Sequence, residues 1–479
     1  MLFNSLEFAI FFPLLFVINS LLLKRSLKVQ NLFLLFASYF FYACWDWRFL
    51  FLLIFSTALD FFTGNKIAQS NTLRIRRAWL LLSVLINVGF LAFFKYMNFF
   101  IDNFSALLHG LGLHPGMHVL SIVLPVGISF YTFHGLSYVF DIYNRKIQPC
   151  PSWINYSLFV GFFPLLVAGP IERATHLLPQ IEKPRQFNYA KAVDGMKQIL
   201  WGLFKKIVIA DTCAHYVNLV FNHPGDYSGS TLFLGAVFFS FQIYGDFSGY
   251  SDIALGTARI LGIELLQNFS FPYFSRDIAE FWRRWHISLT TWFRDYLYIP
   301  LGGSRNGMLR AIRNTMIIFL ISGFWHGANW TFIVWGLLNA IYFLPLLVLK
   351  RNRLSLDTVA EGRTWPSFRE LSGMLITFSL TVFAWIFFRA ETLSKAVSMI
   401  GKIFSASFFT KPEFITGNVT VLILIFLVIE WNGRKNHYAI ETFGIQRSRF
   451  VRWSFYYLIV LAILLLKPAE DQPFIYFQF

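Results

Sequence analysis

Long apolar runs recur from one end of the chain to the other, and they restrict the fold more than any other feature. An α-helix needs about 20 consecutive, mostly apolar residues to cross the hydrocarbon core of a bilayer. Runs of this kind, some of which need their flanks to reach that length, occupy residues 5–23, 78–94, 231–243, 372–388 and 453–466. Only 14% of the residues are charged, whereas a soluble protein carries about a quarter. We therefore predict an all-α polytopic membrane protein.

The apolar runs and the loops between them predict the arrangement of the chain in the membrane. Their number indicates about 11 transmembrane helices in one domain over residues 1–479. The run 5–23 has no basic segment before it and no small-residue cleavage site, so we expect it to remain as the first span. Basic residues gather in the loops 66–77 and 142–148 and are absent from 102–118. Because basic loops face the cytoplasm, both chain ends are expected outside it.

Charge and cysteine usage argue against several other functions. The net charge is +16, from 41 Lys and Arg against 25 Asp and Glu. In a membrane protein such an excess is typical of cytoplasmic loops, and without a basic tail or soluble module we expect no nucleic-acid partner. The three cysteines, Cys44, Cys150 and Cys213, show no paired spacing. That pattern supports neither a disulfide framework nor a zinc site.

Two apolar segments have basic residues on both sides, which a single crossing would not explain. Residues 152–170 are followed by another basic stretch, so either they dip into the membrane and return or the charge rule fails there. Residues 314–349 lie between Arg313 and Lys350, with His326 near the middle. A re-entrant segment or a hairpin satisfies both flanks. Irregular backbone at that depth needs protein or water around it, which predicts a buried polar cavity.

His326 has two interpretations that the residues alone leave balanced. It can be a core histidine that is hydrogen-bonded between helices. However, polar residues within the membrane are functional candidates by default, and Gly323 and Gly327 permit a break or a close backbone approach beside it. A histidine can accept and return a proton near neutral pH. His326 is therefore a candidate catalytic residue.

The segment 275–303 is amphipathic and rich in aromatic residues. Its aromatic and aliphatic side chains recur at helical spacing on one side, and most of its charged side chains lie elsewhere. This pattern predicts a helix that lies at the cytoplasmic interface, with Glu280 and Arg284 paired at i,i+4. His286 lies at the edge of the aromatic side. For His286 the residues alone favour a membrane anchor over a functional role.

Four arginines in or near this segment are candidate phosphate ligands. Arginine suits phosphate because its planar guanidinium group donates two parallel hydrogen bonds. The alternative, lipid-headgroup anchoring, is favoured by the residues alone. The four are Arg283, Arg284, Arg294 and Arg305.

Two aspartates, Asp246 and Asp252, interrupt an apolar run, and two lysines, Lys205 and Lys206, lie in another. A buried carboxylate is costly unless it is paired. We therefore predict a structural clasp between an aspartate and a basic residue, in preference to a catalytic acid.

Several motifs together resemble the membrane-bound O-acyltransferase family, and within it the bacterial branch that contains the alginate O-acetyltransferase membrane subunit. The resemblance extends over essentially the whole chain with the motifs in the expected order. They are FYTFHGLSYVFDIYNRK, YGDFSGYSDIALG, FWRRWHISLTTWFRDYLYIPLGGSR, SGFWHGANWTFIVWGLLNA and the closing FIYFQF.

The resemblance implies a fold with re-entrant and interfacial helices around a central tunnel. It places the family's invariant histidine on His326 and its second motif histidine on His286, both as catalytic residues. It implies cytoplasmic acetyl-CoA as acyl donor, no permanently bound cofactor and no metal. The acceptor would be a cell-surface polysaccharide, and transfer to it would involve a periplasmic esterase-like partner. The enzyme itself would lie in the bacterial inner membrane.

The chemistry of acyl transfer leaves alternatives open. His326 can act as the general base for the attacking hydroxyl or carry the acetyl group itself. Peptidoglycan O-acetylation and teichoic-acid D-alanylation are competing functions of the same class. A transporter or flippase with a polar path through Asp246, Lys205 and His326 is the alternative from another class. That alternative predicts internal repeats, and we find none in the sequence.

Overall fold

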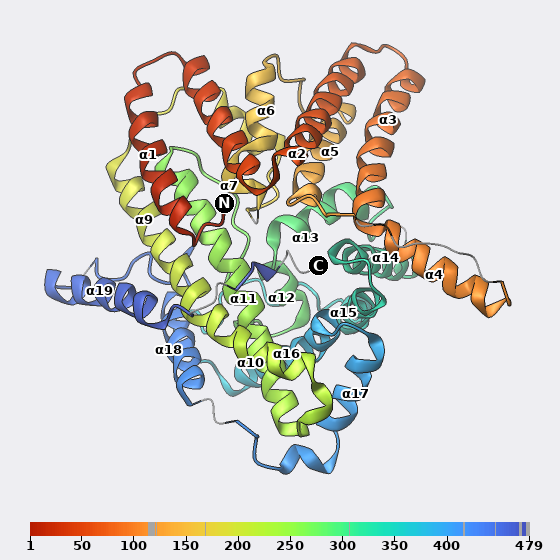
Figure 1. The fold of residues 1–479 in the computed structure, drawn as a ribbon, viewed down its shortest axis with the longest axis vertical. Helices are drawn as coiled ribbons and strands as arrows, with labels where there is room; N and C mark the ends of the chain where they lie inside the picture. The colour runs from red at the N-terminus through yellow and green to blue at the C-terminus, as the bar shows by residue number, and fades with distance from the viewer. Residues whose placement is uncertain are drawn as a thin grey trace. The chain divides into compact units, whose positions relative to one another are not determined.

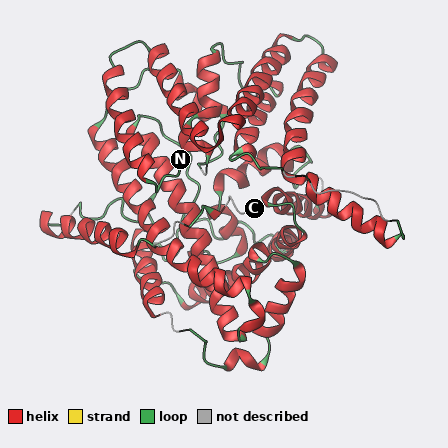
Figure 2. Ribbon diagram, in the orientation of Figure 1, coloured by secondary structure: helices red, strands yellow, loops and turns green. Residues whose placement is uncertain are grey.

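The computed structural model describes residues 1–113, 120, 122–167, 169–305, 307–414, 417–445, 447–468 and 472–475. Every regular element in those ranges is a helix (Figure 2). Five of the described helices are long and apolar enough to cross a membrane: Leu27–Gln69, Leu73–Gly110, Trp330–Val348, Phe368–Arg389 and Arg449–Leu466. Two shorter helices, Leu6–Leu22 and Gly417–Gly433, are also apolar. The all-α membrane fold is thus confirmed, while the count of about 11 spans stays a prediction.

The chain divides into two compact units. The first comprises residues 1–192 and 257–266. The second comprises residues 193–256 and 267–479. Figure 1 labels most of the helices of both units.

In the first unit the long helix α2 (Leu27–Gln69) packs against three partners: α3 (Leu73–Leu91), α5 (Ile128–Tyr143) and α6 (Trp153–Gly161). A buried polar cluster joins three of these helices. The Asp60 carboxylate accepts hydrogen bonds from Ser83 (2.6 Å) and Asn87 (2.8 Å). On α5, a Cβ atom at Gly135 would overlap the same carboxylate. Glycine at 135 therefore lets α5 approach the buried carboxyl group of Asp60.

The segment 152–170 forms two short helices, α6 and α7 (Phe163–Leu166), which are separated by Phe162. Neither is long enough to cross a bilayer. The chain therefore makes no continuous span here, as the dip-and-return interpretation requires. Ala168 lies outside the described residues.

In the second unit α14 (Met308–His326) and α15 (Trp330–Val348) lie side by side as a hairpin (Figure 1). Glycines make this packing close. A Cβ atom at Gly323 would lie 2.3 Å from the Phe332 carbonyl oxygen, and one at Gly336 would lie 2.4 Å from that of Phe319. Arg313 and Lys350 consequently lie at the same end of the pair. The predicted hairpin is confirmed.

The prediction of one continuous helix over 275–303 is wrong. The segment forms α12 (Ile278–Arg284), α13 (Ile287–Phe293) and the π-helix η5 (Arg294–Tyr298). The chain is extended at Trp285, and His286 has left-handed backbone angles, φ 43° and ψ 54°. Its aromatic side is buried within the unit and not turned toward a membrane surface. Helical spacing indicated which side chains are buried, but it carried no information on where the backbone turns.

Candidate active site

His326 is the last residue of α14, at the tip of the α14–α15 hairpin. Its side chain is buried, and its ring lies nearly perpendicular to those of Trp335 (5.2 Å between centroids, 87°) and Phe388 (5.2 Å, 70°). Phe388 belongs to α16 (Phe368–Arg389). At Gly327 a Cβ atom would lie 2.1 Å from the Phe332 ring. Glycine at that position is therefore required for the turn that encloses the imidazole in aromatic rings.

The side chain of Asn329, next to this turn, has a structural role. Its Oδ1 accepts from the Thr331 N–H (3.0 Å) and so caps the N-terminus of α15. Its Nδ2 donates to the Glu391 carbonyl (2.9 Å). Because both ends of the amide are engaged, Asn329 is poorly placed to stabilise an oxyanion.

The structure brings the two predicted histidines to one tryptophan. The Trp325 ring lies 4.9 Å from that of His326 and 6.3 Å from that of His286. The break between α12 and α13 allows this, because it turns His286 into the protein. Both imidazoles therefore lie in the same buried aromatic region of the second unit.

The surroundings of His286 are those of an enclosed residue and not of a membrane anchor. The Phe247 ring lies 4.7 Å away at 89°. Nδ1 lies 3.1 Å from the Asn268 Oδ1. Nε2 is buried and has no hydrogen-bond partner among the residues that the structure describes. Burial lowers the pKa of His286 to about 3, so the ring is neutral at physiological pH.

Arg283 and Arg284 fasten the loop 349–367 to α12. The Arg283 guanidinium donates to the carbonyls of Asn352 (2.8 Å) and Ser355 (2.7 Å). Arg284 donates to the Asp357 carbonyl (3.1 Å) and pairs with Glu280 (2.9 Å). The predicted i,i+4 pair is confirmed. A phosphate would have to compete with these carbonyls for either guanidinium.

The other two arginines are differently placed. Arg294 pairs with its neighbour Asp295 (2.7 Å), yet 59% of its side chain is exposed. Arg305 is exposed in the turns between η5 and α14. Their guanidinium groups are accessible from solvent, as phosphate ligands must be.

The aspartate and lysine residues form the predicted clasp. Lys205 lies 2.6 Å from Asp252, and Lys206 lies 2.9 Å from Asp246. All four side chains are buried. Two further partners of the clasp were not predicted, Asp211 at 2.8 Å from Lys206 and the Ile475 N–H, which donates to Asp246 at 2.7 Å. The clasp thereby holds the described end of the C-terminal segment, while the last four residues of the FIYFQF motif lie outside the described residues.

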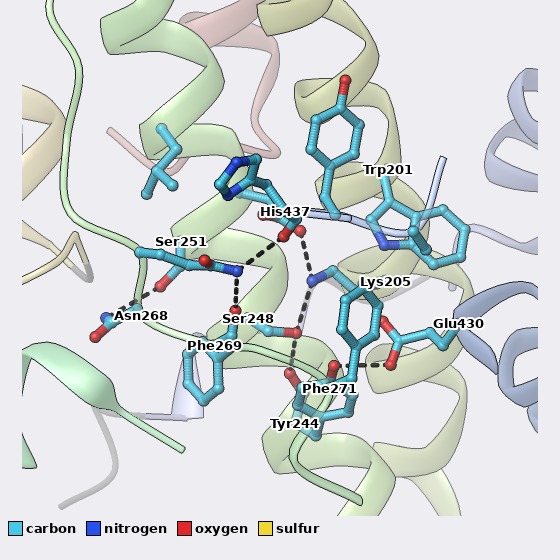
Figure 3. Close-up of a pocket in the computed structure, with 15 residues that line it drawn as sticks. Trp201, Lys205, Tyr244, Ser248, Ser251, Asn268, Phe269, Phe271, Glu430 and His437 are labelled. Atoms are coloured by element: carbon cyan, nitrogen blue, oxygen red, sulfur yellow. Dashed lines mark hydrogen bonds and ion pairs between the residues drawn. The ribbon is translucent and has the colours of Figure 1, made fainter. Parts of the chain in front are cut away.

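A small polar pocket of about 20 Å³, partly open to solvent, lies beside the clasp (Figure 3). Lys205 donates to Ser248 (2.8 Å), and the Tyr244 hydroxyl donates to Glu430 (2.7 Å). Asn268, the partner of His286, lines the same pocket. Sequence reasoning missed Asn268 and Glu430, since an isolated asparagine or glutamate carries no motif. Within the described ranges no three His, Cys, Asp or Glu side chains could together hold a metal ion.

Comparison with known proteins identifies similar chains. Residues 143–388 match the family described as MBOAT, membrane-bound O-acyltransferase family. The chain is 36% identical, over the full length of both chains, to a probable alginate O-acetylase of Pseudomonas putida. It is 38% identical to a peptidoglycan O-acetyltransferase of Helicobacter pylori, over 77% of this chain and 73% of that one. It is 28% identical to a teichoic acid D-alanyltransferase of Bacillus subtilis, over 58% of this chain and 71% of that one.

Proposed function

The chain belongs to the membrane-bound O-acyltransferase family, and from this premise we propose that it O-acetylates an extracytoplasmic polysaccharide such as alginate. The full-length similarity to a probable alginate O-acetylase carries the proposal. The chain is an acyltransferase, and the proposal concerns its acyl group and its acceptor. We also propose that residues 1–479 form a single membrane acyltransferase domain.

The enclosure around Trp325 supports His326 and His286 as the catalytic pair. In the reaction a neutral imidazole at His326 takes the proton of the acceptor hydroxyl. The hydroxyl oxygen then forms a bond to the acetyl carbonyl carbon, the carbon–sulfur bond of the thioester breaks, and the leaving thiolate takes up the proton. If His326 instead carries the acetyl group, its imidazole nitrogen first bonds to the acetyl carbon as the carbon–sulfur bond breaks. That carbon–nitrogen bond then breaks as the hydroxyl oxygen bonds to the same carbon, and the hydroxyl proton passes to the released imidazole. The aromatic walls exclude water, which would otherwise hydrolyse the donor.

We propose cytoplasmic acetyl-CoA as the donor, with no permanently bound cofactor. Its phosphates would contact Arg294 and Arg305, whose side chains are exposed. Arg283 and Arg284 would contribute indirectly, by holding the loop 349–367 against α12. The acetyl group then passes through a central tunnel toward the outer side of the inner membrane, where an esterase-like partner assists its transfer to the polymer.

A second acceptor is supported by a specific observation. The Helicobacter pylori relative is named a peptidoglycan O-acetyltransferase and is at least as similar over its matched part. Peptidoglycan is therefore the alternative polymer. D-alanyl transfer to teichoic acid is less well supported, because that relative is less similar and matches only 58% of the chain.

One experiment tests donor and acceptor together. Detergent-purified protein is incubated with acetyl-CoA, and release of the CoA thiol is followed with and without an alginate oligosaccharide. In parallel, the acetyl content of surface polysaccharide and of peptidoglycan is measured in cells that lack the protein. We expect thiol release that depends on the oligosaccharide, and loss of acetyl groups from the polysaccharide alone. Loss from peptidoglycan alone would favour the alternative polymer, and no thiol release would exclude acetyl-CoA.

A further inference from the structure

Asn268 holds the break at His286 through its backbone and its side chain together. Its carbonyl accepts from the Ile287 N–H (2.9 Å), and two residues later the Ser270 N–H donates to the Arg284 carbonyl (3.0 Å). The Asn268 Oδ1 accepts from the Ser288 hydroxyl (2.7 Å) and lies 3.1 Å from His286 Nδ1. A short irregular strand thus replaces the helical hydrogen bonds that are missing between α12 and α13.

These contacts determine which way the Asn268 amide points. The backbone N–H of Ser288 also faces the amide at 3.4 Å, and a backbone N–H can only donate. The amide atom on that side must therefore be the oxygen. On its other side Nδ2 donates to the Ser251 hydroxyl at 3.3 Å, as Figure 3 shows for these two residues. The reversed amide would place two donors against each other.

The orientation of the amide in turn determines the tautomer of His286. Because the amide oxygen accepts, the imidazole Nδ1 must carry the hydrogen. A neutral imidazole has one N–H, so Nε2 carries the lone pair. That nitrogen is buried and has no hydrogen-bond partner in the described part of the chain. A buried acceptor without a hydrogen-bond donor destabilises the folded protein, unless a bound ligand donates a hydrogen bond to it.

We propose that Asn268 is a positioning residue of the acyl-transfer site, which fixes His286 as the Nδ1–H tautomer and so offers its Nε2 as a hydrogen-bond acceptor to a second hydroxyl of the acyl acceptor, beside the one that His326 deprotonates. The proposal rests on the proposed function, because it takes the hydroxyl to be that of the acyl acceptor. Asn268 itself does not touch the substrate. It acts through His286, as the carboxylate of a catalytic triad acts through its histidine.

A purely structural role for Asn268 makes different predictions. Substitution of the Asn268 side chain leaves the two backbone hydrogen bonds, from Ile287 to Asn268 and from Ser270 to Arg284, in place. A variant therefore keeps part of the contacts that hold the break. Ser288→Ala is the matched control, since it removes the 2.7 Å bond to Oδ1 and leaves the 3.1 Å contact with His286. If Asn268 only holds the loop, Ser288→Ala and the Asn268 variants should lose folded protein to a similar degree and share the kcat of the parent per folded protein.

The informative substitution is Asn268→Asp. A carboxylate still accepts from His286 Nδ1, but it brings a negative charge next to the ring and raises the pKa of His286. In the parent protein burial alone lowers that pKa, and the charged groups that line the pocket beside Asn268 are Lys205, Asp252 and Glu430. Because the pKa of His286 starts at about 3, the ring stays neutral near pH 7 after this rise. Asn268→Asp therefore keeps the Nδ1–H tautomer, which Asn268→Leu does not enforce.

The test follows CoA thiol release by full-length purified parent, Ser288→Ala, Asn268→Leu and Asn268→Asp proteins, with acetyl-CoA and an alginate oligosaccharide. For Asn268→Leu we expect kcat per folded protein to fall on the order of 10²-fold while KM stays near the parent value. For Asn268→Asp we expect kcat within about tenfold of the parent, because the carboxylate still accepts from Nδ1–H. Ser288→Ala should keep the parent kcat per folded protein.

An Asn268→Asp protein as slow as Asn268→Leu, or a parent kcat in Asn268→Leu, would overturn the assignment. If neither Asn268 variant folds, Asn268 is a structural residue only, and the assignment also fails. A parent protein that releases no thiol would instead count against the proposed function, so the two failures are distinguishable.

Discussion

The imidazole of His326 lies almost perpendicular to the indole of Trp335, with ring centroids 5.2 Å apart and 87° between the planes. Trp335 is itself fully buried in α15. The tip of the hairpin is therefore packed, and the histidine is part of that packing. Truncation of His326 to alanine would leave a cavity among aromatic rings, which costs stability as well as chemistry. A substitution that keeps the volume is the cleaner test.

His326→Gln should abolish acetyl transfer while the protein inserts and purifies like the parent. If His326 is a general base, we expect a loss of about 10²–10⁴ in rate. If it carries the acetyl group, essentially no transfer should remain. The rate of acetyl transfer per milligram of purified membrane protein distinguishes these outcomes. Trp330→Phe is the control, because Trp330 adjoins the same turn but is 51% exposed. A parent rate in His326→Gln would make His326 a core histidine.

Asp246→Asn should lower the yield of folded protein together with activity. Both partners of the Lys206–Asp246 pair are almost completely buried, at 1% and 2% side-chain exposure. Loss of one partner of a buried pair typically costs about 3–5 kcal/mol, although Asp211 remains beside Lys206 and reduces that cost here. Thermal unfolding in detergent measures the effect. Asp295→Asn removes an exposed pair and should change stability by less than about 1 kcal/mol.

The outcome for Asp246 also separates two roles. A variant that unfolds at the parent temperature but transfers no acetyl group would make Asp246 part of the chemistry. In that case the clasp would no longer be a purely structural feature.

The clasp and the hairpin were predictable from the sequence for a simple physical reason. Charges within apolar runs must find partners, and the two aspartates and two lysines were the candidates at hand. Likewise Arg313 and Lys350 on both flanks of one apolar segment demanded that the chain turn back. In both cases a single rule, the pairing of buried charges or the position of basic flanks, was sufficient to predict the feature.

The turn at His286 was not predictable in the same way. Left-handed backbone angles are uncommon outside glycine, and nothing in FWRRWH marks them. The residue that stabilises the turn, Asn268, lies in an irregular segment 18 positions earlier. Aromatic spacing over 275–303 correctly indicated a buried side, but it could not tell lipid from protein as the surface that covers it. The catalytic roles of the histidines remain predictions.

We expect Arg283→Ala to affect folding and Arg305→Ala to affect donor binding. Arg283 holds two carbonyls of the loop 349–367, so its loss should reduce the amount of folded protein and leave the KM for acetyl-CoA near the parent value. Arg305 is exposed, so its loss should raise that KM more than it lowers kcat. Steady-state kinetics at varied acetyl-CoA measure both. A raised KM in Arg283→Ala at normal yield would return that arginine to the donor site.

His176 gives the first unit a stability that depends on pH. Its ring lies 2.8 Å from the Glu172 carboxylate, and this hydrogen bond raises the pKa of His176 above its ordinary value. The folded protein therefore binds the proton more tightly than the unfolded chain does. The extra stability is fully present below the ordinary pKa of about 6.5 and is lost as pH rises through the raised value.

We accordingly expect the unfolding temperature of the detergent-purified protein to fall as pH rises from about 6.5 through the raised pKa of His176, by an amount that His176→Gln removes. The effect should be about 1 kcal/mol or less, because 37% of the His176 side chain is exposed. Glu172 also accepts from the Leu266 N–H (2.6 Å), so it keeps one partner in the variant and the fold should survive. Unfolding curves for both proteins across this pH range provide the measurement. Parallel curves would mean that the His176–Glu172 pair adds nothing to stability.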